Sequence, residues 1–147
     1  MANVLVVYST MSGNTKIAAE IIADGARSAG AKVTLKAAGE AQPQDLVRCE
    51  AVALGSYDAF SYMGGGLKDF FDRAFYPTQG QVTDKPYVAF LTHGGGGKAI
   101  ASIESVAQSF KLKKVADSVL VKGKPEGPAI AALKSLGARL AAGVEKS

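Results

Sequence analysis

Near the start of the chain, residues 4–15 read VLVVYSTMSGNT. The first five residues of this stretch are apolar and mostly β-branched, a pattern typical of a parallel strand buried on both faces. Its last seven residues are uncharged, and apolar residues at helical spacing follow over 17–29. The stretch therefore predicts a buried strand, a polar loop and the N-terminus of a helix in succession.

The polar loop, residues 9–15, has the chemistry of a phosphate site. Free backbone N–H groups and the positive end of the dipole attract an anion to a helix N-terminus. Gly13 lets the backbone approach a ligand, and four residues add hydroxyl donors: Ser9, Thr10, Ser12 and Thr15. The loop has neither the Walker pattern nor the dinucleotide fingerprint. The alternative is that Ser12 only caps the helix, which explains one of the hydroxyls. We predict that the loop binds a phosphate monoester.

The rest of the chain alternates strand and helix patterns. Strands are predicted at 32–36, 51–56, 87–92 and 115–121, and helices at 67–75, 100–110 and 130–144, with Pro77 ending the first of these helices. Residues 37–50 are interpreted as a connection that contains one short turn. Such alternation predicts an α/β fold: a doubly wound, five-stranded parallel sheet with helices on both faces. Ligands of such sheets bind at the carboxyl ends of the strands.

Two further loops, residues 57–64 and 93–97, follow strands and are expected at the same edge of the sheet. Tyr57, Phe60, Tyr62 and Met63 offer stacking surfaces for a flat heteroaromatic ring; alternatively, some of them cover the helix behind. Four glycines follow His93, so backbone N–H groups are free to meet the edge of a ring; alternatively, this is a flexible turn. We interpret His93 as a hydrogen-bonding or surface residue and assign it no catalytic role.

The length and composition of the chain exclude several classes of protein and of site. The chain has 147 residues, enough for one domain over residues 1–147. A single Cys and a single His leave no disulfide framework and no Cys- or His-based metal site; we expect Cys49 to be structural. Neither a membrane span nor a signal peptide is recognisable, which predicts a cytoplasmic protein. Basic residues are not interleaved with aromatic ones, so nucleic-acid binding is not expected.

Charge is unevenly distributed along the chain. The net charge is +4; residues 98–147 carry nine basic and four acidic residues, whereas residues 1–97 carry eight and nine. A basic surface favours acidic partners or anionic ligands. The alternative is an ordinary solvated face with no binding role.

The motif Thr10-Met11-Ser12-Gly13-Asn14-Thr15 resembles the phosphate loop of the flavodoxin family, Ser/Thr-x-Thr/Ser-Gly-Asn-Thr, and the length and order of elements resemble its short-chain form over essentially the whole chain. This resemblance implies strand order 2-1-3-4-5 and non-covalent FMN, with its phosphate at residues 9–15 and its isoalloxazine ring between the other two loops. The implied cofactor-binding residues are Ser9, Thr10, Met11, Ser12, Gly13, Asn14, Thr15, Ser56, Tyr57, Asp58, Ala59, Phe60, Tyr62, Met63, Gly64, His93, Gly94, Gly95 and Gly96.

The resemblance implies an FMN-dependent electron carrier. Residues 63–73 also resemble the loop-to-helix segment of flavodoxin-like quinone and flavin reductases, so a small NAD(P)H-dependent oxidoreductase is the alternative. A non-redox binding module on the same scaffold is a second alternative. The chain departs from the electron-carrying members of the family by having no Trp and a positive net charge. Because of the positive charge, we expect the redox partner protein to be acidic. We expect the protein itself to be a monomer or a weak homodimer.

Overall fold

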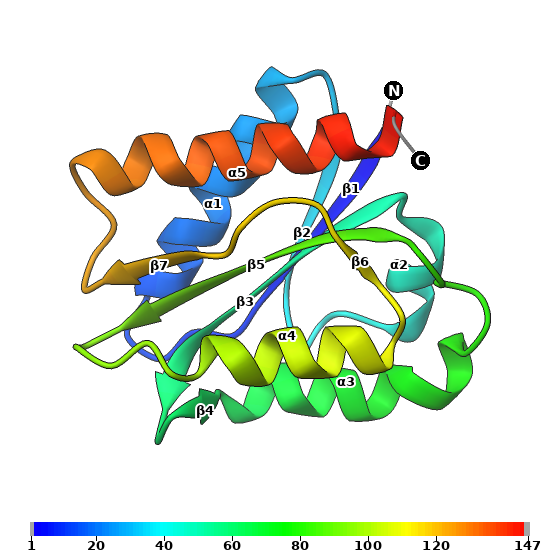
Figure 1. Ribbon diagram of the computed structural model, residues 1–147, viewed down its shortest axis with the longest axis horizontal. Helices are drawn as coiled ribbons and strands as arrows, with labels where there is room; N and C mark the ends of the chain where they lie inside the picture. The colour runs from blue at the N-terminus through cyan, green and yellow to red at the C-terminus, as the bar shows by residue number, and fades with distance from the viewer. Residues whose placement is uncertain (1, 146–147) are drawn as a thin grey trace.

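A twisted parallel sheet forms the middle layer of the molecule (Figure 1). The computed structural model describes residues 2–145. The main strands are β1 (Asn3–Tyr8), β2 (Lys32–Ala37), β3 (Ala51–Ala59), β5 (Pro86–His93), β6 (Lys113–Lys114) and β7 (Val119–Lys122), and a short β4 (Tyr62–Met63) pairs with β3. Helices α1 (Asn14–Ser28) and α5 (Pro128–Glu145) cover one face, and α2 (Pro43–Arg48), α3 (Gly65–Thr78) and α4 (Ile100–Ser109) cover the other.

The strand order confirms the predicted topology. The sheet runs β2-β1-β3-β5-β6, and β7 also pairs with β5, so β6 and β7 together take the place of the fifth strand. Every pair along this path is parallel; Val6 of β1, for example, lies between Leu35 of β2 and Ala53 of β3. The carboxyl ends of these strands therefore meet at one edge, called here the carboxyl edge, and present the loops at 9–13, 57–64 and 93–97 side by side.

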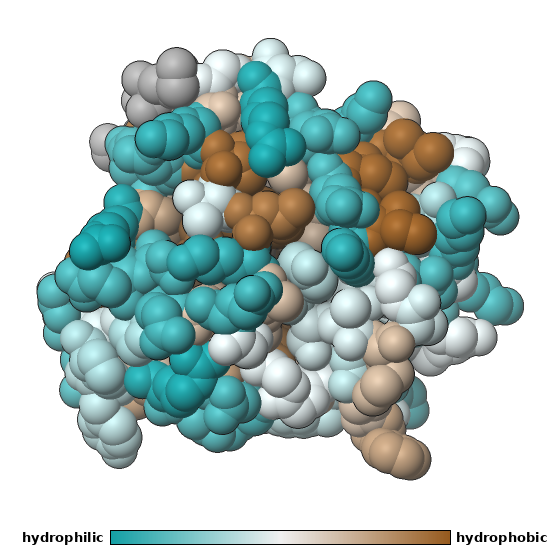
Figure 2. All heavy atoms as spheres, turned by 180° about the vertical axis from the view of Figure 1, so that it is seen from behind, coloured by the Kyte–Doolittle hydropathy of each residue, from teal (hydrophilic) through white to brown (hydrophobic). Residues whose placement is uncertain are grey.

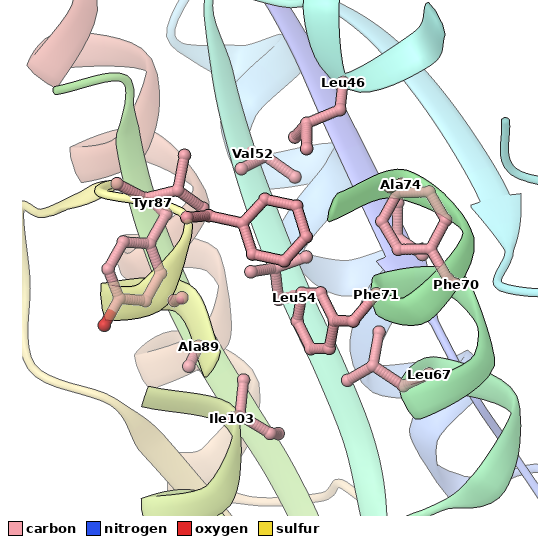
Figure 3. Packing of buried hydrophobic residues seen from close by; sticks show 14 of the residues in the cluster. Leu46, Val52, Leu54, Leu67, Phe70, Phe71, Ala74, Tyr87, Ala89 and Ile103 are labelled. Atoms are coloured by element: carbon pink, nitrogen blue, oxygen red, sulfur yellow. The ribbon is translucent and has the colours of Figure 1, made fainter. Parts of the chain in front are cut away.

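The apolar run of β1 serves two cores. Val4 and Val6 belong to the cluster under α1 and α5, whereas Leu5 and Val7 belong to the cluster under α2, α3 and α4. Figure 3 shows the second cluster, in which side chains of α3 point toward those of β3. Ile103 of α4 packs in the same cluster. A strand with both faces buried needs apolar residues at every position, as the sequence pattern predicted.

Helices α1 and α5 approach each other closely at two glycines. A Cβ built on Gly25 would overlap the carbonyl oxygen of Lys134, and one on Gly137 would overlap the carbonyl oxygen of Ile22. Only glycine leaves room for backbone contact of this kind. This contact helps to hold α1, and with it the loop that begins the helix, against the sheet.

Two of the predicted connections contain regular structure. The segment 37–50 contains α2, which begins at Pro43. At its N-terminus, the Asp45 carboxylate accepts the backbone N–H of Gln42 at 2.8 Å. At its C-terminus, the Lys85 ammonium donates to the carbonyls of residues 46 and 47. In the predicted loop 57–64, β3 continues to Ala59 and forms a hairpin with β4.

The predicted end of one helix and the predicted last strand were wrong. Helix α3 continues through Pro77 to Thr78, whose hydroxyl donates to the carbonyl of Ala74 at 2.9 Å in the last turn. Of the predicted strand 115–121, residues 119–121 lie in β7, whereas residues 115–118 are not in a strand and separate β7 from β6. Glu104 of α4 accepts hydrogen bonds from Lys114 in β6 (2.6 Å) and from Ser118 at the end of this break (2.8 Å). None of the described helices meets the length and hydropathy needed to cross a bilayer.

Candidate functional site

The loop at 9–13 delivers an open helix N-terminus to the carboxyl edge. Gly13 is the N-cap of α1 with φ +99°, no side chain caps the helix, and its first turn contains no acidic residue. The interpretation of Ser12 as a mere N-cap is therefore wrong. The hydroxyl oxygen of Thr10 accepts the N–H of Gly13 at 3.1 Å, which fixes the shape of the loop. The remaining first-turn N–H groups and the hydroxyl of Ser12 are left for an anion.

Buried contacts anchor this loop to the sheet and to α3. The N–H of Ser9 donates to the carbonyl of Gly55 at 3.0 Å, and a Cβ on Gly66 would lie 3.0 Å from the Ser9 hydroxyl oxygen. The hydroxyls of Thr15 and Thr92 form a buried hydrogen bond of 2.7 Å. Since each hydroxyl has one proton and one of the two protons occupies this bond, the other remains available to a ligand.

The β3–β4 hairpin supplies the aromatic surface that the sequence predicted. Its two turn residues, Phe60 and Ser61, have φ of +56° and +66°, as a tight two-residue hairpin turn requires. Phe60 is fully exposed and Tyr62 is 42% exposed. Tyr57 is half-buried against Gly64, where a Cβ would lie 2.5 Å from the Tyr57 ring. The outward-facing aromatic side chains are therefore those of the hairpin tip.

Other predicted residues of this segment lie behind that surface. The Met63 side chain is buried in the core, and its N–H donates to the Ser102 hydroxyl at 2.9 Å. The buried Ser56 hydroxyl donates to the Tyr57 carbonyl and accepts the N–H of Gly64 at 2.7 Å. Ala59 is half-buried at the end of β3. Met63 and Ser56 thus shape the loop from within.

Asp58 links the hairpin to the glycine loop. One carboxylate oxygen accepts the N–H of Ser61 at 2.8 Å, and the other accepts the N–H of Ala99 at 3.2 Å. A carboxylate engaged in this way is a positioning group, since it holds two segments that are 41 residues apart in the sequence at a fixed separation. Neither Ala99 nor Ser102 was recognised from the sequence, because nothing in the residues near position 100 signals a contact with position 58.

The glycine loop is ordered by its own histidine. Nδ1 of His93 accepts the N–H of Gly95 at 3.0 Å, which places the proton of the neutral ring on Nε2. The carbonyl of His93 accepts the N–H of Gly123 at 2.8 Å. Gly94, Gly95 and Gly96 are exposed, whereas Gly97 is buried beside Leu120 and the His93 ring. The loop thus presents backbone without side chains at the carboxyl edge.

This arrangement of three loops coincides with a family match. A sequence model described as flavodoxin matches residues 6–134. The chain belongs to the flavodoxin family.

Individual proteins of known family are also similar to this chain. A flavodoxin of Aquifex aeolicus is 38% identical over 104 residues, covering 69% of this chain and 56% of that protein. An NAD(P)H dehydrogenase (quinone) of Caulobacter vibrioides is 32% identical over 128 residues, covering 70% and 64%. The chain thus spans between half and two thirds of the length of these relatives. The structure of an archaeal flavodoxin superimposes with a TM-score of 0.90 at 26% identity, covering 97% of this chain.

The residues at the carboxyl edge fit the FMN that membership of the flavodoxin family implies. A phosphate monoester needs several donors and no nearby acid, which the open, acid-free start of α1 and the hydroxyls of its loop provide. A flat ring needs apolar faces and a few polar edge contacts, which the hairpin and the glycine loop offer. Thr92, the partner of Thr15, was missed by the sequence analysis, although its position at the end of a predicted strand was a usable signal.

Cys49 takes no part in this site. It lies before β3, at the other end of the strands, and its thiol donates to the carbonyl of Leu46 at 3.3 Å. Burial raises the pKa of the Cys49 thiol to about 11, so the thiolate is scarce at neutral pH. The prediction of a structural cysteine is confirmed.

Proposed function

We propose that this protein is a non-covalent FMN-dependent electron carrier of the cytoplasm. One observation carries the proposal: an uncapped, acid-free helix N-terminus with hydroxyl donors lies at the same sheet edge as an exposed aromatic hairpin and a glycine loop. The first element suits the phosphate of FMN, and the other two suit its ring. Membership of the flavodoxin family supports the same assignment.

The chain's own groups have defined tasks in this proposal. The N–H groups at the start of α1 and the hydroxyls of Thr10 and Ser12 bind the phosphate. The hairpin tip shields one face of the ring from water, and Asp58 keeps the hairpin and the glycine loop at a fixed separation. When bound, FMN supplies the ability to accept and release electrons, which side chains of the protein lack.

The polar groups of the site favour a carrier over an acid–base enzyme. Both oxygens of Asp58 accept backbone N–H groups, and Nδ1 of His93 accepts the N–H of Gly95. These contacts hold the backbone and leave the Nε2–H of His93 free, so Asp58 and His93 are not paired with each other as general acid and base. Electron transfer requires no such group.

An NAD(P)H-dependent quinone or flavin reductase is the second candidate function. It is favoured by the likeness to the NAD(P)H dehydrogenase (quinone) of Caulobacter vibrioides and by exposed lysines at the carboxyl edge, which suit a nucleotide phosphate. A non-redox binding module on the same scaffold is the remaining alternative. It predicts that the protein has no affinity for FMN.

Visible absorption separates these functions. The purified protein is mixed with FMN, the excess is removed by gel filtration, and the flavin absorption of the protein fraction is measured. Retained flavin supports both redox functions, and a colourless protein would contradict them. The retained complex is then mixed with NAD(P)H and a quinone under anaerobic conditions. A carrier is expected to show no sustained turnover, whereas sustained oxidation of NAD(P)H would identify the reductase.

A further inference from the structure

Exposed apolar side chains are concentrated at the carboxyl edge. Within residues 2–145, the exposed large apolar residues are Met11, Phe60, Tyr62, Tyr76, Leu120 and Ile130. All except Tyr76 belong to this edge: Met11 lies in the phosphate loop, Phe60 and Tyr62 in the hairpin, Leu120 beside Gly97, and Ile130 in the first turn of α5. In Figure 2, hydrophobic side chains project at the lower right, where the hairpin lies. Clustering of this kind marks an interaction site.

Phe60 contributes nothing to the fold that would explain its presence. Its side chain is fully exposed, so it buries no apolar area. Its backbone has φ +56°, a conformation that costs a bulky L-residue roughly 1–2 kcal/mol and that asparagine or glycine adopts more easily. An unfavourable residue that fails to pack points to a role at the surface.

Lysines without an ion pair lie in two segments of the carboxyl edge. Lys98 follows the glycine loop, Lys122 lies opposite His93 in the sheet, and Lys124 follows Gly123 in the next turn. All three are exposed, and the described structure shows no ion pair for any of them. In the segments 93–98 and 120–127, these three lysines stand against one acidic residue, Glu126, so the two segments together are positively charged. The carboxylate of Asp58 in the hairpin already accepts two backbone N–H groups.

The opposite edge has basic charge without the apolar surface. There, Lys113, Lys114 and Arg139 line a cavity of about 450 Å³ at the start of β5. The Lys114 ammonium is paired with Glu104 at 2.6 Å, and Tyr76 is the exposed large apolar residue outside the carboxyl edge. Within residues 2–145, several exposed apolar side chains and unpaired lysines occur together at the carboxyl edge, whereas Tyr76 stands alone, and this distinguishes the carboxyl edge as a docking surface.

We propose that the carboxyl edge docks an acidic redox protein. This inference rests on the proposed function, because it assigns a partner to the same site. Carboxylates of the partner pair with Lys98, Lys122 and Lys124 and speed the encounter, while an apolar centre of the partner contacts Phe60 and Tyr62. Contacts of this type give fast, salt-sensitive association and release, which a carrier needs.

The test is a binding measurement that requires no turnover. FMN is first offered to the protein and the excess removed. Two-dimensional amide NMR spectra are then recorded while an oxidised, acidic 2Fe–2S ferredoxin is added at about 20 mM and about 500 mM salt. We expect shifts or broadening confined to residues 57–64, 93–98 and 120–124, and loss of binding at high salt. A basic c-type cytochrome is the second probe and is expected to bind at least about tenfold more weakly.

Charge reversal supplies the control. The pair Lys122→Glu and Lys124→Glu should weaken ferredoxin binding about tenfold. The pair Lys32→Glu and Lys113→Glu changes the net charge equally at the other edge and should alter binding less than about twofold. Equal effects of the two pairs, shifts elsewhere, preferred binding of the cytochrome, or a homodimer that buries Phe60 would overturn the inference. Failure to retain FMN would refute the proposed function instead, whatever the titration shows.

Discussion

Replacing Asp58 by alanine tests whether one carboxylate holds the two ring loops together. The change removes hydrogen bonds of 2.8 Å to Ser61 and 3.2 Å to Ala99. A hydrogen bond to a charged acceptor contributes about 1.5 kcal/mol at the lower end of its range, and the exposed bond to Ser61 contributes less. We therefore expect Asp58→Ala to lower the free energy of unfolding by about 2 kcal/mol. Asp58→Asn keeps one acceptor oxygen and should lose about half as much.

Urea unfolding followed by circular dichroism gives these free energies, and hydrogen exchange gives a local readout. In Asp58→Ala, the amides of Ser61 and Ala99 should exchange faster, while those of β1 should change only with global stability. Asp117→Ala is the control, because this exposed carboxylate accepts no hydrogen bond in the described structure; it should stay within about 0.5 kcal/mol of the wild type. If Asp58→Ala had the same free energy of unfolding as the wild type and the amide of Ala99 exchanged at an unchanged rate, the Asp58 carboxylate would not hold the two loops together.

Two further predictions concern the body of the protein. Gly137→Ala should destabilise the protein by at least about 2 kcal/mol, because its Cβ would overlap the Ile22 carbonyl and push α5 from α1; Gly39→Ala, which meets open space, should have little effect in the same urea assay. The Cys49 thiol should resist alkylation at about pH 8 until the protein unfolds. Its pKa is raised from 9.0 to about 11, so its contribution to stability is complete below pH 9 and is lost as the pH rises to 11. The free energy of unfolding of the wild type, measured relative to that of Cys49→Ala, should therefore fall between pH 9 and pH 11. A difference that stays constant over this range would contradict the raised pKa of the Cys49 thiol.

The parts of the fold that local patterns determine could be predicted from the sequence. Residues 4–15 combine a doubly buried strand with a polar loop, and parallel pairing then brings the three loops to one edge. The β3–β4 hairpin was missed because its turn residues, Phe60 and Ser61, are not the asparagine and glycine that signal such a turn. The break between β6 and β7 was missed because residues 115–118 contain no glycine or proline, and Glu104 of a different helix holds the excursion.

The connections within the site depend on tertiary structure. Thr15 bonds to a residue 77 positions away, and Asp58 to one 41 positions away. No local pattern carries this information, so the sequence indicated which loops meet but not which atoms join them. The same limit applies to Met63, whose neighbours in the sequence suggested a ring contact, whereas the packing of α3 and α4 buries its side chain in the core.

A phosphate site at residues 9–15 is tested by comparing FMN with riboflavin, which lacks the phosphate. Binding of each flavin is followed by quenching of flavin fluorescence in the wild type and in Ser12→Asp. A carboxylate at the open start of α1 repels a phosphate group that carries about −1.5 to −2 charges. We expect FMN to bind far more tightly than riboflavin, and Ser12→Asp to weaken FMN by about a hundredfold while changing riboflavin binding less than about threefold. Ser135→Asp, on the exposed surface of α5, should change neither. Equal affinities for the two flavins, or equal losses in Ser12→Asp, would contradict a phosphate site at residues 9–15.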